Sequence, residues 1–233
     1  MSLTKDYSSL KAAINILNAA ELLAHPNESL VYDSGYAKRV RGLTYKDYWN
    51  FHMENFYYHC MLKDNSLFLY EESSYRFIMS PISVPTEEQY IYGELGDVWD
   101  SFTDDEKLIY RSSTSFTSEY EKFLETTSDY KSSTPVRLDK HPHQYNKHDH
   151  PAHHLHIGYE NESRMPVKRV LNVYAFTTFI ISTFYPKGWT KLIDNSFFDK
   201  DSIGKIKMDL ETINRIYADK WCMDNEETRL YLI

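Results

Sequence analysis

The chain has 233 residues, of which 42% are hydrophobic and 15% aromatic, and its formal net charge is −8. This composition predicts a globular protein with a buried core, excludes disordered and collagen-like classes, and argues against a general polyanion binder. The two distant cysteines indicate neither a disulfide framework nor a cysteine zinc site, and no signal peptide or membrane span is seen, so we expect a soluble, cytoplasmic protein without membrane contacts.

The first third of the chain predicts helices followed by a hairpin. Apolar residues recur at helical spacing over residues 5–24, and Pro26 should end that helix. Residues 30–43 predict a loop or short strand, and Thr44 is an N-cap candidate for an aromatic helix over 45–62. The β-branched and aromatic runs on either side of Ser73 are typical of two paired strands.

The remaining elements alternate between helices and strands. We expect helices over 86–98 and 104–126 (the second opened by a T-x-x-E capping box and weakened by its serines), strands over 135–140 and 152–159, helices over 173–185 and 201–217, and a strand over 228–233. The predicted fold class is α+β, with a small, mostly antiparallel central sheet flanked by several helices. We expect one domain over 1–233, with an N-terminal helical part at 1–63 and a histidine-rich core at 134–190.

The stretch 141–158 contains seven of the ten histidines. Histidine titrates near neutral pH and is the commonest metal ligand, so this density indicates a functional site. Alternation along the second strand puts His154 and His156 on one face and Leu155 on the other. The segment 131–169 carries seven Lys and Arg against four Asp and Glu, which suits a site for a phosphate or carboxylate.

Two catalytic interpretations compete for this stretch. In the first, His154 and His156 act as general acid and base on a phosphodiester, Asp139 fixes a tautomer, and arginines hold the phosphate. In the second, histidines and Asp139 bind a divalent metal such as Zn²⁺, Mn²⁺ or Fe²⁺. The candidate catalytic residues are His154, His156, Asp139 and His150; the candidate substrate-binding residues are Arg137, Arg164, His143 and Lys140; and the candidate metal ligands are His154, His156 and Asp139.

Two further interpretations involve no turnover: binding of a nucleotide or protein partner, or purely structural histidines. Gly-rich phosphate loops, a G-x-S-x-G elbow and an H-E-x-x-H helix do not occur in the sequence. The leading interpretation is a nuclease-like phosphodiesterase acting on RNA or a nucleotide, and a metal-binding hydrolase and a non-catalytic binding module stay open as alternatives.

The run VRLDKHPHQYNKHDHPAHHLHIGYENESRMPVKRVL, followed by AFTTFIISTFYPKGW, resembles an uncharacterised bacterial family known as a domain of unknown function. That family shares an R-x-D strand, an H-P-x-x-H-x-H-x-G strand, an R-x-P turn and a helix ending F-Y-P. Carried across, the resemblance marks Arg137, Asp139, His150, His154, His156, Gly158, Arg164 and Pro166. The segment RLDKHPH…HPAHHLH is also similar to small toxins of bacterial toxin–antitoxin pairs, which implies RNA as a substrate and an antitoxin-like protein as a partner.

The pattern makes two geometric predictions. The short connection between strands 135–140 and 152–159 predicts that they are neighbours, which would bring Arg137 and Asp139 close to His154 or His156. Arg164 follows the histidine strand in a turn restricted by Pro166, and we expect its guanidinium to point back to the site as an anion anchor.

Overall fold

The computed structural model describes residues 6–83, 85–126, 129–160, 162–198 and 201–222. The chain forms two compact units, residues 1–80 with 133–233 (unit 1) and residues 81–132 (unit 2). The two units are treated separately below, and one continuous domain over 1–233 stays a prediction. The expected terminal strand at 228–233 lies outside the described residues.

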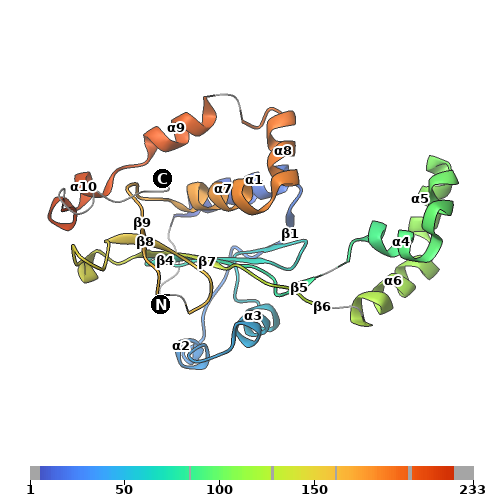
Figure 1. Ribbon diagram of the computed structural model, residues 1–233, viewed down its shortest axis with the longest axis horizontal. Helices are drawn as coiled ribbons and strands as arrows, with labels where there is room; N and C mark the ends of the chain where they lie inside the picture. The colour runs from blue at the N-terminus through green and yellow to red at the C-terminus, as the bar shows by residue number, and fades with distance from the viewer. Residues whose placement is uncertain (1–5, 84, 127–128, 161, 199–200, 223–233) are drawn as a thin grey trace. The chain divides into compact units, whose positions relative to one another are not determined.

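Unit 1 is built on an antiparallel sheet, which confirms the α+β fold class (Figure 1). Among the described residues, seven strands pair in the order β1 (Leu23–Pro26), β2 (Cys60–Leu62), β3 (Leu67–Tyr70), β4 (Ser74–Ile78), β7 (Val136–Lys140), β8 (His153–Ile157) and β9 (Met165–Pro166). The predicted hairpin around Ser73 is confirmed as β3 and β4, whose Leu67 and Ile78 are register partners.

Helices cover both faces of this sheet. In Figure 1, α1 (Tyr7–Ala19) and α7 (Val173–Phe184) lie on one side, and α2 (Tyr36–Arg39) and α3 (Tyr45–Glu54) lie on the other. The main core forms under α1 and α7, where Leu17, Phe176 and Leu155 are each fully buried. The remaining helices of this unit are η2 (Pro142–Gln144), α8 (Pro186–Asp194), α9 (Ser202–Asp209), α10 (Ile213–Ile216) and η3 (Ala218–Lys220).

Unit 2 is mainly helical. It contains β5 (Ile82–Ser83), α4 (Glu87–Leu95), η1 (Gly96–Ser101), α5 (Asp104–Ser112), α6 (Thr114–Thr126) and β6 (Asp129–Tyr130). Both α4 and α5 begin with a capping box, at Thr86 and Thr103, and the break at Ser113 falls in the serine-rich stretch where the sequence weakens a single helix. A separate apolar cluster around Trp99 and Phe116 holds these helices together.

Besides the helix over 104–126, which breaks at Ser113, three predicted helices are wrong at their ends or in their continuity. The helix over 5–24 ends at Ala19, because Glu21 adopts a left-handed φ of 58° and Leu23–Pro26 then pairs as a strand. The helix over 45–62 ends at Glu54, because Phe56 has a φ of 55° and Cys60–Leu62 pairs with β3. The helix over 201–217 is two helices, and the loop expected over 30–43 contains α2.

Across the described residues, every helix is too short or too polar to cross a lipid bilayer.

Candidate functional site

The site is formed by two neighbouring strands, as the sequence predicts. β7 and β8 pair antiparallel with Asp139 opposite His154 and Arg137 opposite His156. Because successive side chains of a strand point to opposite faces, these four side chains share one face. Leu155, on the opposite face, packs in the core under α1 and α7, so the site lies on the face that α2 and α3 cover.

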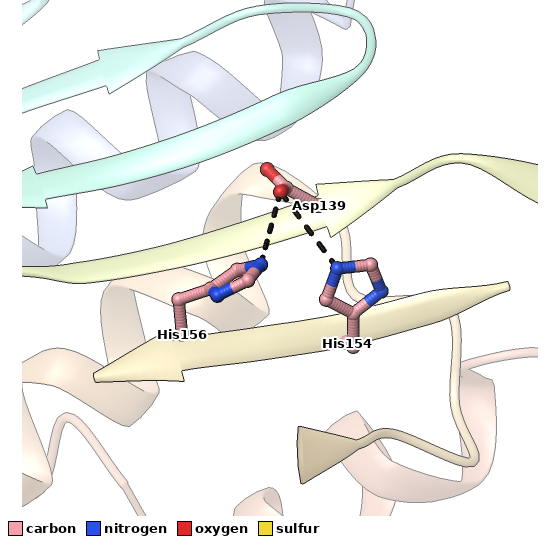
Figure 2. Close-up of side chains that lie close together, drawn as sticks. All are labelled: Asp139, His154 and His156. Atoms are coloured by element: carbon pink, nitrogen blue, oxygen red, sulfur yellow. Dashed lines mark ion pairs between the residues drawn. The ribbon is translucent and has the colours of Figure 1, made fainter. Parts of the chain in front are cut away.

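Two imidazoles converge on one carboxylate oxygen (Figure 2). The Nε2 atom of His156 lies 3.3 Å from Oδ2 of Asp139, and the Nε2 atom of His154 lies 3.8 Å from the same oxygen. All three residues are buried, and each offers one ligand atom within 4.8 Å of the other two. Two nitrogens and one oxygen in this arrangement form a set that can hold a divalent metal.

The chain fixes the tautomer of His154. Its Nδ1 lies 2.9 Å from the carbonyl oxygen of Pro151, and because a carbonyl only accepts, Nδ1 carries the proton. Burial, more than any other effect, lowers the pKa of His154 to about 4, so the ring is neutral and Nε2 presents a lone pair. That lone pair and the Asp139 carboxylate therefore face each other, an arrangement that a cation between them would stabilise.

Asp139 is held in its charged form. Burial acts to raise the pKa of Asp139, but the hydrogen bond from His156 and the charge of Arg137 outweigh it, and the pKa lies below its usual value. The Nε atom of Arg137 is 3.0 Å from Oδ1 of Asp139, so one carboxylate oxygen faces the arginine and the other faces the histidines. The Arg137 side chain keeps 41% of its surface exposed, which leaves it able to contact a ligand.

His150 and Arg164 lie at the edge of this group. The ring of His150 meets that of His154 edge to face, with centroids 4.8 Å apart. Burial is the main cause that lowers the pKa of His150, and the positive charge of Arg164 adds to it. The Arg164 side chain is exposed, and the expected orientation of its guanidinium toward the site stays a prediction.

Lys140 and His143 are not brought to the Asp139 carboxylate. Together with His153 they line a different cavity, which also contacts Tyr217. The Nζ atom of Lys140 lies 3.7 Å from the centroid of the Tyr75 ring. The reason is parity, because Lys140 follows Asp139 by one residue and its side chain leaves the strand on the opposite face. Their expected role as substrate-binding residues of the histidine site therefore lacks the necessary proximity.

Sequence reasoning missed Arg76 on β4. Arg76 is the register partner of Arg137, so the two guanidinium groups leave the sheet on the same face. Arg76 donates to the hydroxyl of Tyr48 at 2.7 Å and lies 3.3 Å from the buried carboxylate of Glu71. Alternation in SYRFI places Arg76 opposite the aromatic positions, but only the pairing of β4 with β7 links it to the histidines.

Comparison with known proteins identifies one uncharacterised family. A family model described as Uncharacterized conserved protein (DUF2290) matches residues 20–217, a span that contains every candidate site residue. No curated protein and no solved structure matches the chain. The function must therefore be argued from the site.

Proposed function

The chain belongs to the DUF2290 family of uncharacterised conserved proteins, and from the geometry of its site we propose that it is a metal-dependent phosphodiesterase acting on RNA or a nucleotide. The observation that carries this proposal is the convergence of three buried ligand atoms, from His154, His156 and Asp139, within 4.8 Å of one another. A set of two histidines and one carboxylate occupies one side of a metal ion and leaves coordination positions for water and substrate.

The surroundings of His154 support a metal ligand. A histidine that binds a metal through one ring nitrogen almost always donates the N–H of its other ring nitrogen to a carbonyl, a carboxylate or a water, and this bond orients the ring. His154 makes this bond to the carbonyl of Pro151. A divalent ion held by these ligands would polarise a phosphoryl oxygen and lower the pKa of a bound water.

The charges around the ligands support an anionic substrate. Arg137 is half-exposed and lies next to Asp139. Arg164 is exposed, and its positive charge helps to lower the pKa of His150. A guanidinium can hold two phosphate oxygens at once, which orients a phosphodiester and stabilises the charge of its transition state. The carboxylate of Asp139 lies between the proposed metal ligands and the proposed phosphate ligand, since Oδ2 faces the histidines and Oδ1 faces Arg137.

A metal-free mechanism is the second candidate, and one observation favours it. His156 lies 3.3 Å from Oδ2 of Asp139, a pair in which the carboxylate orients the imidazole as a general base. The neutral state of His154 and the shared direction of both rings argue against these histidines acting as an acid and a base on opposite sides of a phosphate.

Metal analysis of the purified full chain, combined with an RNA and nucleotide cleavage screen, tests the proposal. After dialysis against Zn²⁺ or Mn²⁺, the protein should retain one equivalent of metal and hydrolyse a substrate in a chelator-sensitive reaction. His154→Ala, His156→Ala and Asp139→Asn should each weaken metal affinity at least about tenfold. Loss of a group that only hydrogen-bonds to a ligand already has an effect of about this size, and each of these variants loses a ligand itself. His143→Ala, an exposed histidine outside the group, is the matched control and should keep both properties.

Three results would overturn the proposal in different ways. Chelator-resistant hydrolysis that needs His156 would establish the metal-free mechanism. Nucleotide binding without turnover would identify a non-catalytic module. Metal retention by all three variants would place the metal elsewhere. An antitoxin-like protein partner stays a prediction of the sequence resemblance.

A further inference from the structure

A cavity of about 230 Å³ opens beside the proposed metal ligands in unit 1. Its walls include the rings of Tyr45, Tyr48 and Tyr159 and the side chains of Arg76 and Arg137. Arg137 also lies 3.0 Å from Asp139, so one side chain belongs to both the cavity and the histidine site. The cavity and the site are therefore adjacent parts of one surface.

The tyrosines present aromatic rings that are fixed in place. The ring centroid of Tyr159 lies 5.2 Å from that of Tyr45 and 5.6 Å from that of Tyr48. The hydroxyl of Tyr159 donates to the carbonyl of Leu43, and that of Tyr45 donates to the carbonyl of Met79. Because these hydroxyls are bound to backbone, the rings are oriented before any ligand arrives.

The two arginines differ in how firmly they are held. Arg76 is mostly buried and held by Tyr48 and Glu71, so its guanidinium is a fixed part of the wall. Arg137, on the neighbouring strand, has the more exposed side chain and contacts only one oxygen of Asp139 closely. The cavity thus combines aromatic rings with one fixed and one accessible guanidinium.

We infer that this cavity binds the base of a nucleotide unit whose phosphate lies at Arg137. Single-stranded nucleic acids are recognised by stacking of bases on aromatic rings and on arginine planes, and the wall supplies both. The volume is below the roughly 300–1,000 Å³ of sites for drug-sized ligands, which suits one planar ring system rather than several nucleotides. This inference rests on the proposed function, and it names the part of the substrate that the protein recognises.

Binding of the four ribonucleoside 5′-monophosphates to the full chain, measured by calorimetry in EDTA, tests the inference without any metal. At least one nucleotide should bind, and ribose 5-phosphate, which lacks the base, should bind more weakly. Tyr159→Leu should weaken nucleotide binding roughly 5- to 150-fold, the loss expected for one stacked base. Tyr159→Phe keeps the ring and loses only its bond to the carbonyl of Leu43, so it should bind nucleotide more tightly than Tyr159→Leu.

A matched control and a second variant make the outcome decisive. Tyr174→Leu replaces a half-buried tyrosine of α7 outside the cavity and should bind like wild type. If Tyr159→Leu does not fold, Tyr45→Leu removes another ring of the cavity and should show the same loss.

Failure of the inference is distinct from failure of the proposed function. Equal binding of nucleotides and ribose 5-phosphate, unchanged binding by Tyr159→Leu, or no nucleotide binding at all would overturn the base pocket even if metal is retained. Absence of metal from wild type, with base-dependent binding intact, would instead overturn the metal centre and leave the pocket in place.

Discussion

Individual histidines of this chain differ in what their ring nitrogens contact. His154 and His156 face a carboxylate, whereas His52 lies between the hydroxyl of Tyr36 and the carbonyl of Tyr48. His59 accepts a hydrogen bond from the backbone N–H of Tyr70. His52 and His59 are buried and neutral, and desolvation lowers the pKa of each to about 4. These two rings contribute to the core and not to the site.

Stability should therefore fall on mild acidification. As pH drops below about 6.5, the unfolded state protonates His52 and His59 first, and the folded state does so only near pH 4. The unfolded state then binds more protons, so each histidine lowers the unfolding free energy by up to about 1.4 kcal/mol per pH unit. Urea denaturation at several pH values between 7 and 5 measures this slope.

The variant His52→Gln tests how much of the pH dependence of the unfolding free energy comes from one histidine. Its unfolding free energy should depend less on pH than that of wild type, by about one bound proton. His143→Gln, at an exposed position, serves as the matched control. A slope identical in wild type and His52→Gln would show that this ring is not the source.

At the scale of the element, β8 has one face in the site and the other in the core. Leu155 is fully buried between His154 and His156 in sequence, but its side chain packs under α1 and α7. Within the five residues His153–Ile157, one face of the strand therefore carries candidate metal ligands and the other face packs in the core.

Leu155→Ala should destabilise the protein without removing any candidate ligand. Removing most of a buried leucine side chain should lower the unfolding free energy by about 2–5 kcal/mol, measured by urea denaturation. Val31→Ala, at a position of unit 1 that is 76% exposed, should change it by less than about 0.5 kcal/mol. Similar losses in both variants would contradict the assignment of Leu155 to the core.

The strands of the site were predictable, because two local signals agree. Alternation gave the faces of residues 135–140 and 152–159, and the short connection predicted that the strands are neighbours. Both predictions are confirmed by the pairing of Asp139 with His154. The same alternation also separates Lys140 from Asp139, so the placement of Lys140 in another cavity could have been predicted.

Other parts depend on partners that are distant in sequence. The N-cap candidate and the aromatic residues of 45–62 predict one continuous helix. Cys60–Leu62 instead pairs with β3 and β1, and this tertiary pairing overrides the local pattern. The cavity beside the site joins Tyr45, Arg76 and Tyr159, which come from three separate segments. No periodicity within one segment could bring them together.

At the scale of the molecule, unit 2 is an insertion between neighbouring strands. β4 and β7 pair antiparallel, with Phe77 opposite Val136, and unit 2 occupies residues 81–132 between them. The backbone N–H of Thr134 lies 3.3 Å from the sulfur of Met79, so the chain leaves and re-enters unit 1 at neighbouring points. Each unit also has its own apolar cluster.

Replacing residues 81–132 by a short Gly-Ser turn should leave unit 1 folded. The unfolding free energy of the sheet should change by no more than about 1 kcal/mol, because loop length enters closure entropy only logarithmically. Metal retention should equal that of the full chain, since Asp139, His154 and His156 all lie in unit 1. Circular dichroism and metal analysis measure both properties, and an unfolded or metal-free product would show that unit 2 is required.

The way unit 2 closes on itself has a consequence for the order of folding. Ile82 pairs with Tyr130, and the N–H of Lys131 donates to the carbonyl of Pro81, so the two ends of the insertion are joined by its own backbone. Because the ends of the folded insertion are already paired, the chain loses little further conformational entropy when β4 and β7 come together. If unit 2 forms first, β4 and β7 meet as quickly as the strands of a hairpin would. Slow folding of the insertion would then delay the meeting of Arg76 and Arg137 in the cavity wall, although all the described residues that line this cavity lie in unit 1.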